Sequence, residues 1–289
     1  MFVLQQLISG VAAGSLYALL AVSFVLIYKV TKVANFALGA MMVTSSFLAF
    51  SLLVTHKFSY PMTFVLTLLL SALMGIVLER FVSRPLVQKS ELSMVTGLLA
   101  LWMGLKSLDG LIWGNNYLVM PPLFRKEPYR VLGLVVAPAN LWIVVTACAL
   151  MLGFFFFFRS TRVWIALRAV SQNRLASVLV GVSVTAAFSL TWVIAGVVGA
   201  ASGILMAPLL GLDPEMDFVG LKAVVAAVVG GFESLPGAVV CGLALGVLEN
   251  VVGIFAPTEV KDSIAFFLAV SVLMLKPGGI FGEARAKKV

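Results

Sequence analysis

MFVLQQLISGVAAGSLYALLAVSFVLIYK, residues 1–29, contains no charged side chain before Lys29. A helix needs about 20 apolar residues to span the hydrocarbon core of a bilayer, so this run is long enough to cross. No basic residue precedes the apolar run, and the run is too long for a signal peptide. We therefore expect a transmembrane helix that is retained.

The rest of the 289-residue chain has the same character. Hydrophobic residues make up 62% of it, charged residues make up 11%, and its mean hydropathy is +1.12. One water-soluble core could not bury so much apolar surface, so the sequence predicts an integral membrane protein. The net charge of +8 comes from short basic clusters between apolar runs, which disfavours nucleic acid as a partner. Cys148 and Cys241 lie in apolar runs without a Cys-x-x-Cys motif or a Cys/His cluster, so neither a disulfide framework nor a metal site is indicated, and we expect no cofactor.

Nine apolar runs predict an all-α polytopic membrane protein, with one transmembrane domain over residues 1–289 and about nine transmembrane helices (range 7–9). The expected helices cover residues 3–28, 33–55, 60–78, 92–114, 139–158, 182–210, 218–232, 236–256 and 262–275. The seventh and ninth runs are short, and short runs are often re-entrant.

Basic residues predict the orientation, because Lys and Arg accumulate in cytoplasmic loops. Clusters follow the first, third, fifth and ninth helices. They share one side only if the N-terminus is outside, the C-terminal EARAKKV is inside and the number of crossings is odd. Both short helices therefore cross or neither does, and we expect nine crossings, with seven as the alternative.

Glycines recur four residues apart, which lets helix backbones approach closely in lipid. The pairs are Gly10 and Gly14, Gly199 and Gly203, and Gly242 and Gly246. We expect ordinary helix packing; the alternative is a surface for a second membrane subunit.

RAVSQNRLASVLVGVSV, residues 168–184, interrupts the apolar chain within a predicted cytoplasmic loop, residues 159–183. Its apolar residues recur at helical spacing, which predicts a short amphipathic helix from Arg168 to Gly181. The apolar positions are Leu175, Val178, Leu179 and Val182, and the polar positions include Arg168, Gln172, Asn173 and Ser177. Periodicity alone leaves two interpretations open: a helix that rests on lipid headgroups, or one that docks on a soluble partner.

The same region resembles permease subunits of bacterial ABC importers for branched-chain amino acids, of the LivH type. Its pattern R-A-x-x-Q-N-x-x-A-x-x-x-G matches Arg168, Ala169, Gln172, Asn173, Ala176 and Gly181. The resemblance extends over nearly the whole chain, through GSLYALLAVSFVLIY and NFALGAMM near its start, GLKAVVAAVVGGFESLPGAVVCGLALGVLEN late in it and VKDSIAFFLAVSVLMLKPGGIFG at its end.

The resemblance implies a transport subunit of the cell inner membrane in which residues 168–181 form the coupling helix. It also implies four kinds of partner: a second permease subunit of the LivM type, two ATP-binding subunits, a periplasmic substrate-binding protein and membrane lipid. Consistently, the chain contains no G-x-x-x-x-G-K-[ST] loop to hold ATP phosphates, so energy must come from another polypeptide or from an ion gradient.

Two other classes stay open at this stage. An ion-coupled secondary transporter of amino acids or small organic acids also uses polar residues in the membrane, but the one carboxylate deep in a predicted span is Glu249. An intramembrane enzyme is disfavoured, because His56 lies in a loop and no catalytic constellation of residues occurs in the spans.

Polar residues within the spans are the remaining candidates for a functional site, because an ionisable group in lipid needs a partner. Lys222 and Glu249 have similar predicted outer depth, so we expect them to pair. Asn250, Asn35 and Tyr17 are weaker candidates for a polar path, since interhelical hydrogen bonds are the simpler interpretation. Nearer the outer side, we expect Lys106 and Asp109 to snorkel or pair locally. We expect Asp213, Glu215 and Asp217 to form an acidic patch. Residues 230–237, GGFESLPG, predict a tight turn.

Overall fold

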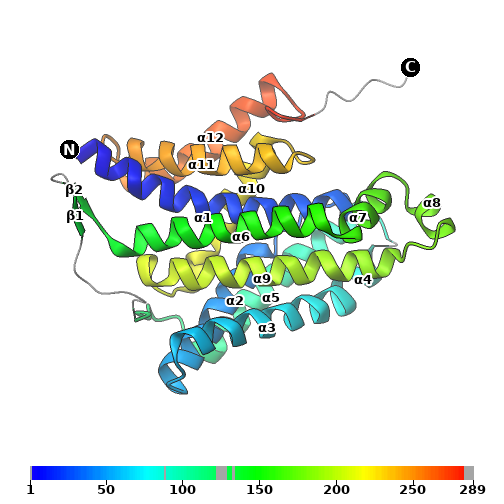
Figure 1. Ribbon diagram of the computed structural model, residues 1–289, viewed down its shortest axis with the longest axis horizontal. Coiled ribbons are helices and arrows are strands. Elements are labelled where there is room, and N and C mark those ends of the chain that lie inside the picture. Colours follow the sequence, from blue (N-terminus) through cyan, green and yellow to red (C-terminus); the bar gives the residue numbers. More distant parts are fainter. Residues whose placement is uncertain (1, 88, 122–128, 132–133, 283–289) are drawn as a thin grey trace. The chain divides into compact units, whose positions relative to one another are not determined.

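The computed structural model describes residues 2–87, 89–121, 129–131 and 134–282. Long helices dominate it (Figure 1). The expected helix boundaries lie within five residues of those observed. The helices up to the central loop are α1 (Phe2–Thr31), α2 (Leu38–Phe50), α3 (Tyr60–Leu78), α4 (Arg84–Leu86) and α5 (Glu91–Trp113). After it come α6 (Pro138–Ser160), α7 (Arg162–Gln172), α8 (Arg174–Leu179), α9 (Val184–Leu210), α10 (Phe218–Gly230), α11 (Leu235–Val252) and α12 (Thr258–Leu275).

Several short elements extend or connect these helices. Two π-helical segments, η1 (Ser51–Thr55) and η2 (Glu79–Ser83), continue α2 and α3, and a 3₁₀ helix, η3 (Pro214–Asp217), precedes α10. In the central loop β1 (Tyr129–Val131) pairs antiparallel with β2 (Leu134–Val136).

Within the described residues, seven helical segments are long and apolar enough to cross a membrane, which makes this an all-α polytopic membrane protein. The two runs expected to be short are short. α10 has 13 residues, and the apolar part of α12 is Ser263–Leu275. At about 1.5 Å per residue α10 measures roughly 20 Å, less than the thickness of a hydrocarbon core. Crossing by these two helices stays a prediction.

Contacts within the chain separate into two compact units. The first contains residues 1–25, 122–150 and 221–289, and the second contains residues 26–121 and 151–220. Helices α1, α6 and α10 each pass from one unit to the other.

In the first unit, α1 and α11 meet through the predicted glycines. A Cβ atom on Gly14 would lie 2.7 Å from the carbonyl oxygen of Leu243, and one on Gly246 would overlap the backbone of Gly14. After α12, the backbone N–H of Ile280 donates to the carbonyl of Val229 at 2.8 Å, which attaches this segment to the end of α10. The glycine pairs of this unit therefore serve ordinary helix packing, as expected.

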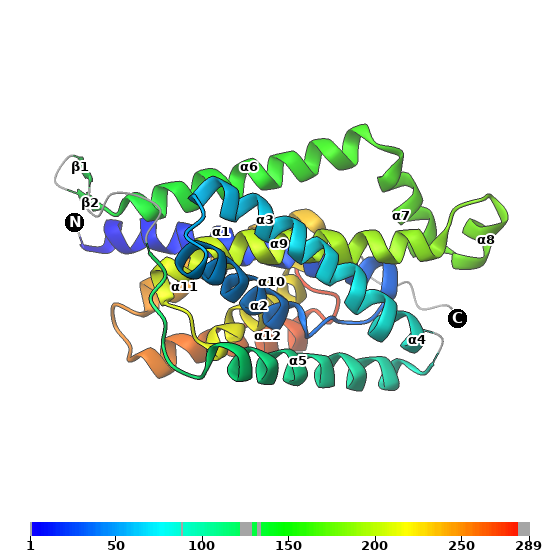
Figure 2. The ribbon, with the colours of Figure 1, turned by 90° about the horizontal axis from the view of Figure 1, so that it is seen from below.

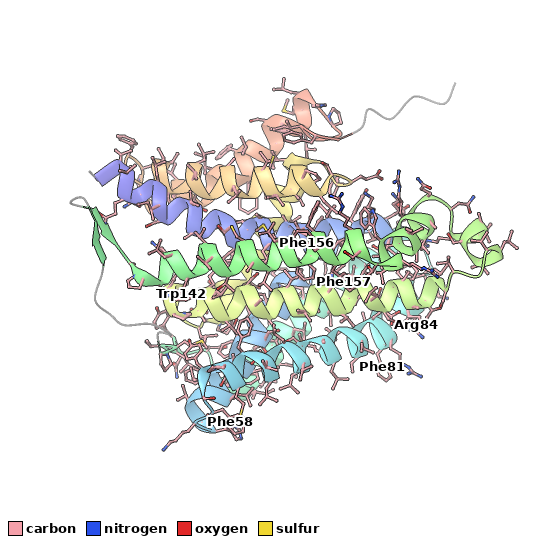
Figure 3. All side chains as sticks on the ribbon, viewed as in Figure 1. Phe58, Phe81, Arg84, Trp142, Phe156 and Phe157 are labelled. Carbon is pink, nitrogen blue, oxygen red and sulfur yellow. The ribbon has the colours of Figure 1, made fainter. Side chains whose placement is uncertain are left out.

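In the second unit, α9 packs against α2 and α3, and α2 also packs against α5 (Figure 2). Gly203 of α9 faces α2 so closely that an added Cβ would lie 2.7 Å from the carbonyl oxygen of Met42. Large apolar side chains remain on the outside of α3 and α6, among them Phe81 beside α3 (72% exposed) and Phe156 on α6 (60% exposed) (Figure 3). Such a surface suits lipid as its solvent.

Candidate functional site

The predicted helix over residues 168–181 is two helices, so the expectation of one continuous helix is wrong. Asn173 interrupts it with extended backbone angles, φ −154° and ψ 107°. Its side-chain Oδ1 accepts a hydrogen bond from the backbone N–H of Ala176 at 3.0 Å and thereby caps α8. Asn readily satisfies backbone donors in this way, which favours a helix start over a helix interior.

Gly181 ends the second helix as predicted. Its φ of +82° lies in the left-handed region that glycine adopts without a steric penalty. The backbone N–H of Val182 donates to the carbonyl of Ser177 at 2.9 Å, and that of Gly181 donates to Val178 at 3.0 Å. This pattern is a Schellman motif, which closes α8 and turns the chain toward α9.

Helix α8 and the residue that follows it, Val180, present four apolar side chains to solvent in the isolated chain. Leu175 is 81% exposed, Val178 59%, Leu179 88% and Val180 75%; we call these four residues the α8 patch. The predicted polar positions divide between exposed Arg168 and Gln172 on α7 and buried Ser177 on α8, while Ala176 is exposed beside the patch. A helix that carries this much uncovered apolar surface needs lipid or a partner to cover it.

Arg174 connects α8 to two longer helices. Its Nη2 donates to the carbonyl oxygens of Val30 at 3.3 Å and Thr31 at 2.9 Å, the last residues of α1. Its guanidinium also lies 5.2 Å from the centroid of the Phe188 ring on α9. Arg174 thus satisfies helix-end carbonyls while it contacts α9, and α8 is not an independent appendage.

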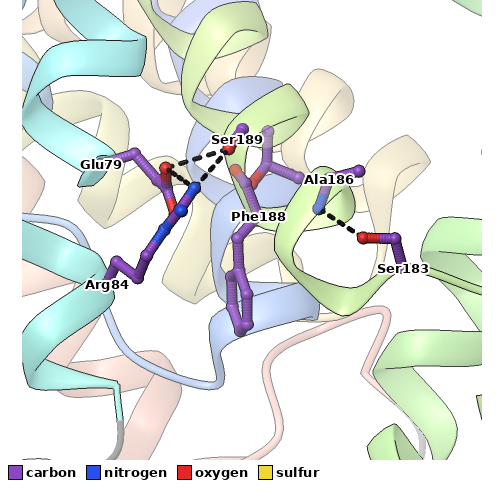
Figure 4. Close-up of polar contacts among 7 residues, drawn as sticks. Glu79, Arg84, Ser183, Ala186, Phe188 and Ser189 are labelled. Carbon is purple, nitrogen blue, oxygen red and sulfur yellow. Dashed lines mark hydrogen bonds and ion pairs between the residues drawn. The ribbon is translucent and has the colours of Figure 1, made fainter. Parts of the chain in front are cut away.

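A buried carboxylate lies in the same unit and bonds Ser189, the residue that follows Phe188 on α9. Glu79 of η2 is 1% exposed and accepts two hydrogen bonds from Arg84, at 3.1 Å and 2.9 Å, and one from Ser189 Oγ at 2.9 Å (Figure 4). Nearby, the Ser183 hydroxyl accepts from the Ala186 N–H at 3.2 Å and caps α9. Sequence reasoning missed this cluster; the one signal was Glu79 shortly before Arg84 at the end of an apolar run.

The predicted pair between Lys222 and Glu249 is present in the first unit. The Lys222 ammonium bonds Glu249 Oε1, and Tyr17 donates from its hydroxyl to Glu249 Oε2 at 2.8 Å. Glu249 is 1% exposed and Lys222 9% exposed. Three of the predicted intramembrane residues therefore form one cluster, and a charge pair with a third donor is the arrangement that such burial requires.

Two further candidates make local bonds. The Asn250 amide donates to the carbonyl of Gly246 at 2.9 Å, one turn earlier in α11. In the second unit, Asn35 is fully buried and its Oδ1 accepts from the N–H of Ala37 at 3.0 Å, just before α2. Its amide nitrogen has no hydrogen-bond partner among the described residues.

The polar groups between α5 and η3 differ from the expectations. Asp217 is 4% exposed and does not belong to a surface acidic patch; it accepts from Trp102 Nε1 at 2.6 Å and pairs with Lys106 at 3.5 Å. Asp109 is 1% exposed and accepts from Thr44 Oγ1 at 2.9 Å, so it does not snorkel. Neither Lys106 nor Asp109 pairs locally, because α5 packs against α2 and η3 and brings distant partners within reach.

Within this unit, an open cavity of about 530 Å³ lies where α5 meets η3. Lys106, Asn115, Asp213 and Glu215 are among the residues that line it. In the part of the chain that the structure describes, no group of three His, Cys, Asp or Glu side chains could hold a metal ion.

The turn over residues 230–237 is as predicted, with Gly231 at φ +103° and Ser234 capping α11.

Comparisons with known proteins identify relatives over the whole chain. Residues 6–275 match the family described as "Branched-chain amino acid transport system / permease component". The high-affinity branched-chain amino acid transport system permease protein LivH of Escherichia coli K12 is 29% identical, over 100% of this chain and 98% of that protein. The corresponding permease protein BraD of Pseudomonas aeruginosa is also 29% identical, over 99% and 98%.

A solved structure shares the fold. PsaBC from Streptococcus pneumoniae in complex with Fab aligns with a TM-score of 0.50 and 14% identity, covering 94% of this chain and 89% of that chain. At this identity the similarity concerns the arrangement of the helices.

Proposed function

The chain belongs to the family of permease components of branched-chain amino acid transport systems, and from this premise we propose that it is the transmembrane subunit of an ATP-driven importer for branched-chain or related amino acids. It is a multi-pass protein of the inner membrane and a transport permease subunit. ATP hydrolysis then belongs to two separate ATP-binding subunits, and the chain itself is not an enzyme. A second permease subunit, of the LivM type, and a periplasmic substrate-binding protein complete the assembly.

The observation that carries this proposal is the α8 patch. Three apolar side chains of α8 and that of Val180 at its end are left uncovered, and Arg168 and Gln172 lie exposed on the preceding helix, where they can bond the rim of a groove. An apolar helix face in a groove with polar bonds at its edge is a common mode of helix recognition. A helix resting on lipid headgroups would need no rigid link to the transmembrane helices, whereas this one is linked twice.

Those links provide the mechanism of coupling. Arg174 bonds the end of α1 and contacts Phe188 of α9, and the next residue, Ser189, bonds buried Glu79 beside Arg84. A displacement of α8 by an ATP-binding subunit would therefore be passed to α1, α9 and the end of α3 by direct contacts. Packed helices move as rigid bodies, so closure of the partner would shift whole helices.

The proposal includes an orientation with the N-terminus outside and the C-terminus inside. Contacts in the second unit support it: Lys29 lies 5.2 Å from the Trp164 ring, Arg84 bonds Ser189, and Arg174 bonds the end of α1. Three of the basic clusters thus gather at one end of this unit, as the positive-inside rule requires for a cytoplasmic surface. The C-terminal residues 283–289 lie outside the described residues.

Purification followed by reconstitution tests the function. The tagged chain, extracted from its native membrane, should copurify with ATP-binding subunits, and the assembly in liposomes should take up leucine only with ATP and a binding protein. Uptake by the chain alone, driven by an ion gradient without ATP, would instead establish an ion-coupled secondary transporter of amino acids or small organic acids.

A further inference from the structure

The cavity between α5 and η3 lies in the second unit. It is near the C-terminal end of α9, which η3 follows, whereas α8 precedes the N-terminal end of α9. Its volume of about 530 Å³ is within the range of small-molecule sites, roughly 300 to 1,000 Å³. Its lining combines polar and charged residues with the apolar side chain of Met103, which is 64% exposed. A thioether side chain adapts its shape, which suits aliphatic groups of varied branching.

Lys106 is held at the wall of this cavity by a buried anion. Its ammonium lies 3.5 Å from Asp217 Oδ2 and 5.9 Å from the centroid of the Phe218 ring, yet its side chain remains 30% exposed. Asp217 is itself fixed by the indole N–H of Trp102. The other carboxylate oxygen of Asp217 is buried and has no hydrogen-bond partner among the described residues. The Asp217 carboxylate therefore holds the Lys106 ammonium at the cavity.

The opposite charge comes from η3. Asp213 Oδ1 accepts from the backbone N–H of Glu215 at 2.8 Å, which orders the start of η3, and both residues line the cavity. Among the described residues, no ion pair joins Lys106 to Asp213 or Glu215; Lys106 pairs with Asp217 instead. The cavity thus presents a cation and two carboxylates that do not neutralise one another.

We propose that this cavity binds a zwitterionic aliphatic α-amino acid, with Lys106 as the partner of its carboxylate, Asp213 and Glu215 as the partners of its ammonium, and Met103 against its side chain. The proposal deepens the proposed function and rests on it for the solute class. Charge-assisted hydrogen bonds to both ends discriminate against molecules that lack either group, because such a molecule makes the bonds of one end only. Amides and organic acids are accordingly poor ligands.

The test compares three probes of similar shape: leucine, 3-methylbutylamine, which lacks the carboxylate, and 4-methylpentanoate, which lacks the ammonium. Binding is measured by calorimetry on the purified assembly without the binding protein. We expect leucine to bind at least about tenfold more tightly than either analogue, since one lost charge-assisted bond corresponds to about a tenfold change or more.

Variants of the cavity residues then test which charged side chain binds which end of leucine. Lys106→Met should weaken leucine about tenfold but leave 3-methylbutylamine unchanged, and Lys106→Arg should restore leucine. The double variant Asp213→Asn/Glu215→Gln should weaken leucine and leave 4-methylpentanoate unchanged. Lys57→Met, which removes an exposed lysine from the loop between η1 and α3, is the matched control and should bind as the wild type does.

Equal affinity for the three probes, or leucine binding that Lys106→Met does not change, would overturn the proposal. An assembly that contains ATP-binding subunits but does not bind leucine in this cavity would overturn it while the proposed function stands. A chain that binds leucine in this pattern but never recruits ATP-binding subunits would overturn the proposed function alone. Thermal unfolding of each variant shows whether a loss of binding comes from unfolding.

Discussion

Leu179→Asp should uncouple the transporter without harming the fold of the permease. Leu179 is 88% exposed in the isolated chain, so its side chain contributes almost nothing to the internal packing. Nearly all of its surface is available for burial in a partner, and burying a leucine side chain stabilises a complex by about 1.5 to 3 kcal/mol. Truncation to alanine should therefore weaken binding of the ATP-binding subunits by about 2 kcal/mol, a factor of about 30 in Kd.

Aspartate adds a second effect, because an unpaired carboxylate in a desolvated groove costs several kcal/mol more. Binding should then fall by more than about a thousandfold, below what purification retains. The assay measures copurified ATP-binding subunits, ATP hydrolysis and leucine uptake together with the melting temperature of the permease. Thr185→Asp, which places the same charge on an exposed residue in the first turn of α9, is the control and should retain all activities. Wild-type coupling by Leu179→Asp would refute the reasoning and leave α8 as an interfacial helix.

Three further experiments test the Lys222–Glu249 pair, the link through Arg174 and the membrane orientation. In a double-mutant cycle, Lys222→Met and Glu249→Gln should show a coupling energy in the range of about 0.5 to 3 kcal/mol, and additive losses in thermal stability would rule out mutual stabilisation. Arg174→Ala should leave ATP-binding subunits attached but raise the ATP hydrolysed per leucine transported, because α8 loses its bonds to α1; an unchanged ratio would exclude Arg174 as a link. A cysteine at Lys287, in a Cys148→Ser background, should resist an impermeant maleimide in intact cells, and labelling from outside would refute the inward C-terminus.

The long helices could be predicted from the sequence because lipid imposes a simple rule on their length and composition. The interruption at Asn173 could not, since the apolar positions that predicted the helix, Leu175 to Val182, all follow Asn173, and only the side-chain bond to Ala176 reveals the new helix start. Lys222 and Glu249 were predicted as a pair because each is ionisable in a span and they share an expected depth.

Other buried charges escaped prediction because their partners come from distant helices. Asp217 looks like one member of an acidic surface run with Asp213 and Glu215, and its burial follows from the packing of α5 against η3, which supplies Trp102 and Lys106. Glu79 looks like an exposed residue at the inner end of a span until Ser189 of α9 is seen to bond it. The spacing of residues along the chain does not predict which faces of two helices pack against each other.

Site-specific crosslinking from position 179 tests most directly the claim that α8 receives the force of an ATP-binding subunit. A photoreactive phenylalanine analogue at Leu179, activated in native membranes, should yield a covalent product that contains both the permease and an ATP-binding subunit. The same analogue at Leu111, 82% exposed on α5 within a predicted span, should not yield that product. Adducts from position 179 with lipid alone would contradict the account.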